Sequence, residues 1–408
     1  MKKYAILTVN MDTIEELLTR GVANIIPGKE ELRKKLESGE KLNIYLGIDP
    51  TATKIHLGHA VPLRKLQALA ELGHNVNFLI GDFTALIGDT SDKDTERPVL
   101  TSEEIHENFQ TYKRQAEKII DFSKVKVVHN RDWLSKLSFE EIVKLCQHYS
   151  VGDFVGRELI RKRLQENKRV GLHELLYPVM QGYDSYFMDT DIQIGGTDQT
   201  FNMQAGRILQ KDLRNKESFV LAMEFLIGTD GRKMSKSWGN AIWLEDGPED
   251  MFGKIMAIED SVIVEYFKLG TRVPMQKVYD VETRLNSGEH PMDIKKELAE
   301  EIVKEFHGEE AAKKAAENFK RTVQDKEIPD EIPVYNYKNF ESLGSIKIID
   351  LLEGSGFVES RSEAKRLVQD KGIKVNGRTI EKIAETIPAE DGLVVQIGKR
   401  RFFKVVSE

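Results

Sequence analysis

The 408-residue sequence has a single cysteine, Cys146, and no long apolar run. One cysteine excludes an internal disulfide and any zinc site built from several cysteines, and it favours a reducing, cytoplasmic setting. We expect no membrane span, because such a span needs about 18 or more consecutive apolar residues. The first residues, MKKYAILTVN, have neither a long apolar core nor a small-residue cleavage site, so we expect no signal peptide either.

Positive charge is also in short supply. The 60 Lys and Arg are outnumbered by 67 Asp and Glu, which gives a net charge of −7 and argues against non-specific binding to nucleic acid. The distribution is uneven, because residues 346–408 contain 12 Lys and Arg against 10 Asp and Glu, and the preceding residues contain 48 against 57. The tail is therefore the basic part of an acidic protein, which is a hint of an anionic partner.

What is present is an alternation of strand-like and helix-like segments. NIYLGI (43–48) is typical of a buried strand, leucines at helical spacing follow in residues 63–72, and NVNFLIGDF (75–83) is again strand-like. Strand–helix–strand units of this kind predict a parallel sheet with right-handed crossovers. Further strands are expected at VKVVHN (125–130), DIQIGG (191–196) and FVLAMEFLIG (219–228), and the first forty residues are expected to form short helices.

The pattern changes after Gly247-Pro248, where strand-like segments stop and helices are expected up to about residue 325. The stretch DKEIPDEIPVYNYKNFESLG (325–344) has two prolines and little helical periodicity, so we predict a linker there. Residues 346–406 are expected to form a compact α+β unit.

Two histidines follow the first predicted strand of the alternating region, in IDPTATKIHLGHAV (48–61). The strand ends at Asp49-Pro50, and His56-Leu57-Gly58-His59 enters a helix. Backbone N–H groups at a helix N-terminus attract anions, and glycine lets a phosphate approach the main chain. The two imidazoles share one side of the first turn, where they can bond phosphoryl oxygens. Capping histidines or an incomplete metal pair are the alternatives that this tetrapeptide leaves open.

A second polar segment, RKMSKS (232–237), follows the last apolar strand. Open α/β sheets bind ligands beyond the carboxyl ends of their strands, so the segment lies where a ligand is expected. Lys233 and Lys236, on a loop flanked by glycines, can close on a polyphosphate and neutralise a departing pyrophosphate. An ordinary solvated turn is the alternative.

Together, HLGH at the first helix and KMSKS far downstream resemble the two signature motifs of the class I aminoacyl-tRNA synthetases, in the same order. The resemblance implies an α/β fold, a Rossmann-like doubly wound parallel sheet, followed by an α-helical domain and a small α+β domain. It also implies the following ATP-binding residues: Gly47, Asp49, His56, Gly58, His59, Gly196, Asp198, Lys233, Met234, Ser235, Lys236 and Ser237.

Four further stretches resemble the tyrosyl-tRNA synthetases of bacterial type: YLGIDPTA (45–52), LIGDTSDKDTER (86–97), LHELLYPVMQGYDS (172–185) and IGGTDQTFN (194–202). The spacing of Tyr177, Gln181 and Asp184 places three polar groups on one helix face, where a carboxylate can accept a buried phenolic hydroxyl. The polar side of an ordinary amphipathic helix is the alternative for this stretch.

The resemblance assigns roles to these positions. It implies that Tyr45 and Asp184 hold the tyrosine hydroxyl, and that Asp89, Tyr177 and Gln181 hold the α-ammonium group. In IGGTDQTFN, the glycine backbone and Asp198 are expected at the adenylate ribose and Gln199 at the amino-acid carboxyl region, although Asp198 also suits an ordinary helix N-cap. The implied catalytic residues are Thr51, His56, His59, Lys93, Arg97, Lys233 and Lys236.

This sequence departs from the family pattern at two places. Leu57 stands where the family usually has Ile, a change that leaves the backbone unaffected. Thr90-Ser91-Asp92 replaces a common Pro-Ser-Gly, which removes a rigid turn and a permissive position and adds a carboxylate near the phosphate path. Lys93 and Arg97 still match basic positions of this loop.

The tail segment 346–380 resembles the S4 RNA-binding domain, with a helix, the loop Ser360-Arg361-Ser362, a second helix and a strand with a VNG turn. Its Lys and Arg side chains are expected to form a phosphate-binding surface, and an ordinary salt-bridged helix face is the alternative. The expected RNA-binding residues are Arg361, Lys365, Arg366, Lys371, Lys374, Lys399, Arg400 and Arg401.

The resemblance covers residues 4–406 and implies four segments. These are a catalytic domain at 1–240, with a helical dimer-interface segment at about 130–185, an α-helical anticodon-arm domain at 241–328, a linker at 329–345 and an S4-like domain at 346–408.

The implied activity is that of a tyrosine–tRNA ligase, which forms tyrosyl-adenylate from L-tyrosine and ATP and charges the 3′ end of tRNA(Tyr) in translation. We expect Mg²⁺ on the ATP phosphates, no tightly bound cofactor, no metal site built by the protein, a homodimer and no membrane association. One alternative is a tryptophanyl-tRNA synthetase, which would lack the Asp184-type acceptor and the S4-like tail. The other is a catalytically inactive synthetase-like RNA-binding protein, which would have lost its signature histidines and lysines.

Overall fold

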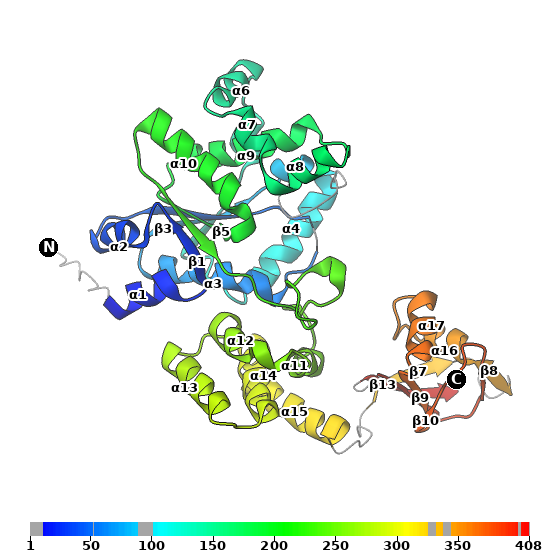
Figure 1. Ribbon diagram of the computed structural model, residues 1–408. Coiled ribbons are helices and arrows are strands. Elements are labelled where there is room, and N and C mark those ends of the chain that lie inside the picture. Colours follow the sequence, from blue (N-terminus) through cyan, green and yellow to red (C-terminus); the bar gives the residue numbers. More distant parts are fainter. Residues whose placement is uncertain are drawn as a thin grey trace. The chain divides into compact units, whose positions relative to one another are not determined.

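A computed structural model describes residues 11–51, 53–88, 101–324, 332–337, 344–398 and 401–407 (Figure 1). The chain divides into two compact units, Met1–Asp246 with Ile258–Ile294, and Gly247–Ala257 with Lys295–Glu408. Among the described residues, no helix is long and apolar enough to cross a membrane.

The first unit is built on a six-stranded sheet with the order β1-β6-β5-β2-β3-β4. Its strands are β1 (Val22–Ile26), β2 (Asn43–Ile48), β3 (Asn75–Ile80), β4 (Val125–His129), β5 (Ile192–Gly196) and β6 (Phe219–Met223). Strands β2 to β6 pair in parallel, as the alternating pattern predicted. Because β2 pairs with both β3 and β5, the direction of winding reverses between β2 and β5, and this switch point is where doubly wound sheets bind ligands.

Strand β1 was not predicted, because only helices were expected in the first forty residues. Residues 22–26 form an edge strand that pairs antiparallel with β6. Their exposure follows no clear alternation, and in this strand Ile25 alone is buried. A five-residue edge strand of this kind carries too little periodicity to be recognised from sequence.

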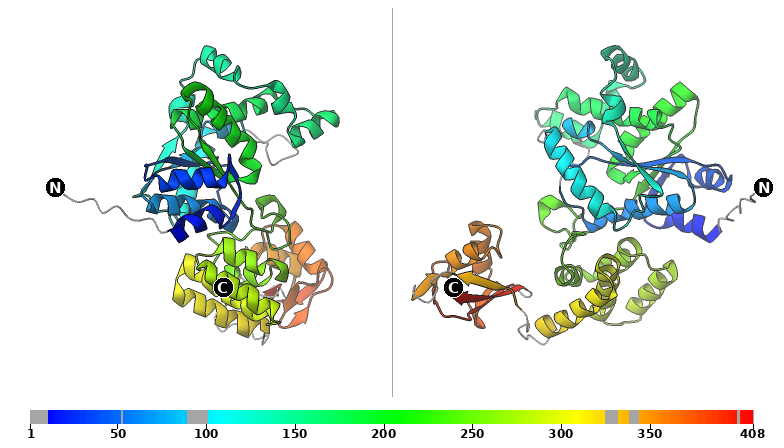
Figure 2. Two further views of the ribbon diagram at one scale, coloured as in Figure 1. Left: turned by 60° about the vertical axis from the view of Figure 1, so that its left-hand side comes forward. Right: turned by 180° about the vertical axis from the view of Figure 1, so that it is seen from behind.

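Helices cover both faces of the sheet (Figures 1 and 2). On one face α10 (Thr200–Arg214) packs against β5, β6 and α9 (Leu172–Phe187). On the other face α3 (Leu57–Glu71) packs against β2, β3 and β5 and also touches α12 (Ile263–Gly270). Of the leucines predicted at helical spacing, Leu63, Leu66 and Leu69 are buried in α3, whereas Leu72 is partly buried at the C-cap.

The other helices of the unit surround this core. A capping box opens α4 (Ser102–Ala116), where the Thr101 hydroxyl accepts from the Glu104 N–H at 3.2 Å and the Glu104 carboxylate accepts from the Thr101 N–H at 2.8 Å. The remaining helices are α1 (Met11–Thr19), α2 (Lys29–Glu37), α5 (Arg131–Leu134), α6 (Phe139–Cys146), α7 (Val151–Val155), α8 (Glu158–Gln165) and α13 (Met275–Asn286), with the single turns η1 (Thr84–Leu86), η2 (Thr197–Gln199), η3 (Lys236–Trp238) and η4 (Asp260–Val262).

In the second unit, α11 (Pro248–Met256) packs against α15 (Glu309–Phe319), and α15 runs into η5 (Lys320–Gln324). Helix α14 (Pro291–His307) lies at the boundary of the two units. Short breaks at residues 271–274 and 287–290 separate α12, α13 and α14.

The C-terminal part of this unit has its own apolar core, to which α16 (Ile348–Ser355) and α17 (Arg361–Gln369) contribute buried residues. Its strands are β7 (Val334–Tyr337), β8 (Ser345–Lys347), β9 (Ile373–Val375), β10 (Arg378–Thr379), β11 (Thr386–Pro388), β12 (Val394–Ile397) and β13 (Arg401–Ser407). The linker predicted at 329–345 is corrected here, because β7 pairs in parallel with β13. Tyr335 and Tyr337 pack on the core, and two prolines nearby hid this alternation from the sequence reading.

Candidate active site

A pocket of about 1140 Å³ opens at the carboxyl ends of β2, β5 and β6, beside the N-terminus of α3. It brings together all the predicted tyrosine and ATP residues whose side chains the structure describes. They are Tyr45, Gly47, Asp49, Thr51, His56, Gly58, His59, Tyr177, Gln181, Asp184, Gly196, Asp198, Gln199, Lys233, Met234, Ser235 and Lys236.

Other predicted residues lie outside the described part of the chain. These are Asp89, residues 90–92 (where the sequence differs from the family pattern), Lys93 and Arg97, and in the tail Lys399 and Arg400. Ser237 belongs to η3 by its backbone, and its side chain is likewise outside the description.

The buried end of the pocket is organised around the Asp184 carboxylate on α9. Asp184 is 2% exposed. Trp133 Nε1 donates to its Oδ1 at 2.7 Å, and Asn130 Nδ2 donates to its Oδ2 at 3.1 Å. Burial raises the pKa of Asp184 to about 8, although both donors act in the opposite direction. The site therefore holds a carboxyl group beside apolar walls, which suits a ligand with an apolar body and one hydroxyl.

Tyr45, on β2, is fixed by a chain of buried amides. Its hydroxyl donates to Gln193 Oε1 at 3.0 Å, and Gln193 Nε2 donates to the Met203 carbonyl at 2.9 Å. Burial and then the nearby Asp184 raise the pKa of Tyr45 well above its usual value. Tyr45 therefore keeps its proton and is positioned as a neutral hydroxyl at the pocket wall.

Asp49, directly after β2, joins the strand end to its neighbours. The Tyr177 hydroxyl donates to Asp49 Oδ2 at 2.9 Å, and the Thr84 hydroxyl donates to Asp49 Oδ1 at 2.8 Å. Tyr177 comes from α9, so this carboxylate ties that helix to the switch point. Gln181 lies on the same helix face and lines the same pocket, as the spacing predicted.

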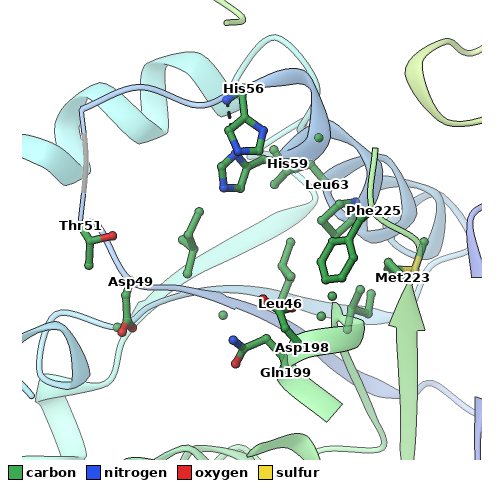
Figure 3. A pocket seen from close by; sticks show the side chains of 18 of the residues that line it. Leu46, Asp49, Thr51, His56, His59, Leu63, Asp198, Gln199, Met223 and Phe225 are labelled. Carbon is green, nitrogen blue, oxygen red and sulfur yellow. Dashed lines mark hydrogen bonds between the residues drawn. The ribbon is translucent and has the colours of Figure 1, made fainter. Parts of the chain in front are cut away.

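The two signature histidines lie against each other at the start of α3 (Figure 3). Their ring centroids are 3.8 Å apart, and the His56 backbone N–H donates to His59 Nδ1 at 3.3 Å. Burial lowers the pKa of His59 to about 4 and that of His56 well below its usual value, so both rings are neutral at pH 7. His56 Nδ1 is buried and has no hydrogen-bond partner among the described residues.

Gly58 suits this packing. A Cβ atom at position 58 would lie 3.0 Å from His56 Nδ1, which is tighter than ordinary contact. A side chain there would press on the His56 ring, which would have to shift by a few tenths of an ångström. The HLGH spacing therefore has a steric reason besides the approach of a phosphate.

Asp198 and Gln199, at η2, lie across the pocket from the histidines (Figure 3). Lys233 reaches this side, with its Nζ 3.3 Å from Asp198 Oδ2 and 3.7 Å from the centroid of the Phe225 ring. Lys236 is exposed at the pocket, whereas Met234 between them is 2% exposed. The loop thus presents its two lysines to the pocket and anchors itself by the methionine.

Several residues that organise the site were missed by sequence reasoning. Asn130 and Trp133 hold Asp184, Gln193 holds Tyr45, and Phe225 faces Lys233. Asn130 carried a usable signal, because it follows β4 directly, just as Asp49 follows β2. The others gave none, because nothing in the local sequence distinguishes these Trp, Gln and Phe residues from ones at ordinary positions.

The predicted RNA-binding Lys and Arg residues of the tail that the structure describes are all exposed: Arg361, Lys365, Arg366, Lys371, Lys374 and Arg401. Some also form ion pairs within the tail. Arg361 pairs with Asp350 at 2.7 Å and with Glu353, and Lys371 pairs with Glu381 at 3.1 Å. Exposed ion pairs of this kind contribute little to stability, so their Lys and Arg side chains stay available to an anionic partner.

Residues 37–324 match the family described as tRNA synthetases class I (W and Y), and residues 348–393 match the S4 domain. The chain is 43% identical over 400 residues to the tyrosine–tRNA ligase of Carboxydothermus hydrogenoformans, covering 96% of this chain and 97% of that protein. It is 41% identical over 392 residues to the tyrosine–tRNA ligase of Thermotoga maritima, covering 96% of each.

Among solved structures, the chain resembles a C-terminally truncated mitochondrial tyrosyl-tRNA synthetase of Aspergillus nidulans. The TM-score is 0.63 at 21% identity, and the match covers 76% of this chain and 93% of that one. At this identity the likeness establishes the fold.

Proposed function

The chain belongs to the class I tRNA synthetases of the W and Y family, and on that premise we propose how its pocket activates tyrosine and charges tRNA(Tyr). The enzyme is a ligase that uses ATP, L-tyrosine and tRNA. The observation that carries the choice of tyrosine is the buried Asp184 carboxyl, held by Trp133 and Asn130 at the closed end of the pocket.

Tyrosine binds with its phenol at Asp184 and Tyr45. The phenolic O–H donates to the Asp184 carboxylate, and the Tyr45 hydroxyl lies at the same end of the pocket. Phenylalanine would leave these buried polar groups without their partner, which costs about 1–3 kcal/mol for each. Tyr177 and Gln181 hold the α-ammonium group, together with Asp89, and Gln199 faces the carboxylate.

Activation needs positioning and charge stabilisation rather than a covalent nucleophile. A carboxylate oxygen of tyrosine attacks the α-phosphorus of ATP, and the bond from that phosphorus to the bridging oxygen breaks. Pyrophosphate leaves with the electron pair, and tyrosyl-adenylate remains. His56 and His59, both neutral, donate hydrogen bonds to phosphoryl oxygens, and Gly196 and Asp198 hold the ribose.

The growing charge on pyrophosphate is met by the loop lysines. Lys233 and Lys236 move onto the leaving phosphates, and Thr51, Lys93 and Arg97 assist there. Mg²⁺ accompanies ATP as part of the substrate and neutralises charge on its phosphates.

Transfer completes the reaction. A terminal ribose hydroxyl of the tRNA attacks the tyrosyl carbonyl carbon and AMP leaves. The S4 domain binds the tRNA phosphates with its exposed basic side chains, namely Arg361, Lys365, Arg366, Lys371, Lys374 and Arg401. Lys399 and Arg400 take part as well. The helices of 241–328 meet the anticodon arm. Because the product is consumed in translation, the enzyme works in the cytoplasm.

We also propose a homodimer formed by the helical segment 130–185. Large apolar side chains are exposed there, with Phe139 81%, Val151 73% and Leu172 74% exposed. Apolar exposure of this extent within one segment is typical of a surface that another protein covers. Light scattering of the purified protein measures the oligomeric state, and a monomer at micromolar concentration would contradict the proposal.

The deciding experiment is ATP–pyrophosphate exchange measured with each of the twenty amino acids. Tyrosine alone should support rapid exchange. Exchange with tryptophan would favour the other branch of the family, and exchange with none would favour an inactive RNA-binding relative.

A further inference from the structure

The loop that carries Lys233 and Lys236 is folded around one buried amide, that of Asn240. The Asn240 side chain is 2% exposed. Its Nδ2 donates to Asp230 Oδ1 at 2.6 Å and to the Lys233 carbonyl at 3.1 Å, and its Oδ1 accepts from the Ser235 N–H at 2.9 Å. Both hydrogens of the amide and its oxygen are thus engaged with the loop.

The backbone around Asn240 closes the same structure. The Asn240 carbonyl accepts from the Thr229 N–H at 3.1 Å, and the Gly228 N–H donates to the Arg232 carbonyl at 2.6 Å. A Cβ atom at position 228 would lie 2.4 Å from the Asn240 amide, so the glycine makes room for that side chain. The loop is therefore a closed turn with Asn240 at its centre.

These bonds are selective in what they fix. They reach the carbonyl of Lys233 and the N–H of Ser235, which are the backbone groups on either side of Met234. Both lysines leave the turn from this short segment. The amide therefore sets the direction in which Lys233 and Lys236 extend toward the pocket.

Asp230 completes the arrangement on the charged side. The Asn240 amide and then the Arg232 guanidinium lower the pKa of Asp230 to about 2, so it accepts as a carboxylate at any ordinary pH. Arg232 also lies over the Trp238 ring, 4.6 Å from its centroid. The donor at position 240 and the acceptor at position 230 form a complementary pair, which a reciprocal exchange of the two residues can test.

We propose that Asn240 is a positioning residue for the activation step, because it holds the loop in the turn that directs both lysines at the ATP phosphates. The proposal rests on the proposed function for the reaction that the lysines serve. Asn240 itself touches the loop and no reacting atom. Its loss should therefore slow adenylate formation and leave tyrosine recognition unchanged.

The test compares Asn240→Asp and Asn240→Ala with the double variant Asn240→Asp/Asp230→Asn, in which the two residues are swapped. In Asn240→Asp the carboxylate can still accept from Ser235, but it faces Asp230 with like charge and gives nothing to the Lys233 carbonyl. We expect kcat of tyrosine-dependent ATP–pyrophosphate exchange to fall about 10- to 100-fold, the range that misplaced catalytic groups typically show. The tyrosine KM and the transfer of tyrosyl from preformed adenylate to tRNA should stay within about twofold.

Swapping the two residues restores a donor at position 230 for the carboxylate at 240. If Asn240→Asp lowers kcat about 100-fold, kcat of the double variant should be at least about tenfold higher than that of Asn240→Asp. Asn24→Asp makes the same substitution at an exposed residue of the edge strand β1 and should match the wild type. Unchanged exchange in both single variants would overturn the proposal. A loss of kcat that the double variant does not recover would overturn it too and indicate a general structural role. The same holds for a loss of kcat accompanied by an equal rise in tyrosine KM.

Amide hydrogen exchange of residues 229–240 provides a readout that does not depend on activity. We expect faster hydrogen exchange of this segment in Asn240→Asp and slower, wild-type-like hydrogen exchange in the double variant. Equal rates in all variants would contradict the claim that Asn240 holds the turn. If the wild type shows no tyrosine-dependent reaction, the proposed function fails. The hydrogen-exchange result then decides whether Asn240 holds the loop.

Discussion

Replacing Asp184 with asparagine tests the choice of amino acid at its most buried group. In the wild type, Trp133 and Asn130 each donate to one carboxylate oxygen. An amide at this position offers a single oxygen, and its NH2 group must face one of those two donors. The incoming phenol therefore meets a neutral acceptor, or no acceptor, in place of a carboxylate.

The expected loss follows from the strength of a buried hydrogen bond to a charged group, which is about 1.5–3 kcal/mol. At about 1.4 kcal/mol per factor of ten, tyrosine affinity should fall roughly 10- to 100-fold. Phenylalanine does not form this bond, so its affinity should change little. The ratio of tyrosine to phenylalanine specificity should therefore fall by about the same factor as the tyrosine affinity.

The raised pKa of Asp184 adds a dependence on pH. Below about pH 8 the carboxyl group of the ligand-free protein keeps its proton, whereas a bound phenol favours the carboxylate. Tyrosine binding then releases a proton, so affinity should rise between pH 6 and 8 in the wild type and stay level in Asp184→Asn. For folding the sign is opposite. The native-state pKa lies above the ordinary 3.8, so the stability linked to this group is complete below about pH 4 and is lost as pH rises through 8.

Tyrosine- and phenylalanine-dependent pyrophosphate exchange at pH 6, 7 and 8 measures these effects. Asp132→Asn, at an exposed residue of α5, is the matched control and should leave both amino acids unaffected. Equal tyrosine KM in Asp184→Asn and wild type, at every pH, would refute the assignment of Asp184 to the phenol.

Three further outcomes are expected. Lys233→Ala and Lys236→Ala should each lower the exchange rate about 100-fold with little change in tyrosine KM, because they act on the departing pyrophosphate; undiminished exchange would return the loop to an ordinary surface turn. Removal of residues 346–408 should spare adenylate formation and impair charging at low tRNA concentration, and full charging there would argue against RNA binding by the tail. Because burial lowers the pKa of His59 to about 4, its charged form is lost above that pH. The pH profile of exchange should therefore lack an inflection near 6.5, and one that His59→Asn removes would contradict the neutral ring.

Residues that follow a strand were the part of the site open to prediction. Asp49 follows β2 and Asp198 follows β5, and parallel strands deliver such residues to one edge of the sheet. The helical spacing of Tyr177, Gln181 and Asp184 likewise predicted a shared face, and all three line the pocket. These inferences needed only local periodicity and the rule for parallel sheets.

The supports of those residues were not predictable, because each bond joins distant parts of the chain. Trp133 and Asp184 are 51 positions apart, and Tyr45 and Gln193 are 148 apart. No pattern in either segment selects the other, since the pairing arises from how α5 and α9 pack and from the register of β2 with β5. The same reason hid β7, whose partner β13 lies at the other end of the tail.

The two signature motifs are also joined by backbone pairing, which limits how the loop can move. The Leu57 N–H donates to the Ile242 carbonyl at 2.8 Å, and the Leu244 N–H donates to the Ile55 carbonyl at 3.0 Å. The far end of the lysine loop is thereby fixed to the HLGH segment, and its near end is held by a bridge between Ile227 and Lys233. A motion that carries Lys236 to a phosphate must therefore take place between these two attachments, in the turn that Asn240 organises. The distance between the motifs in the sequence is thus no measure of their independence, because the histidines and the loop share one framework.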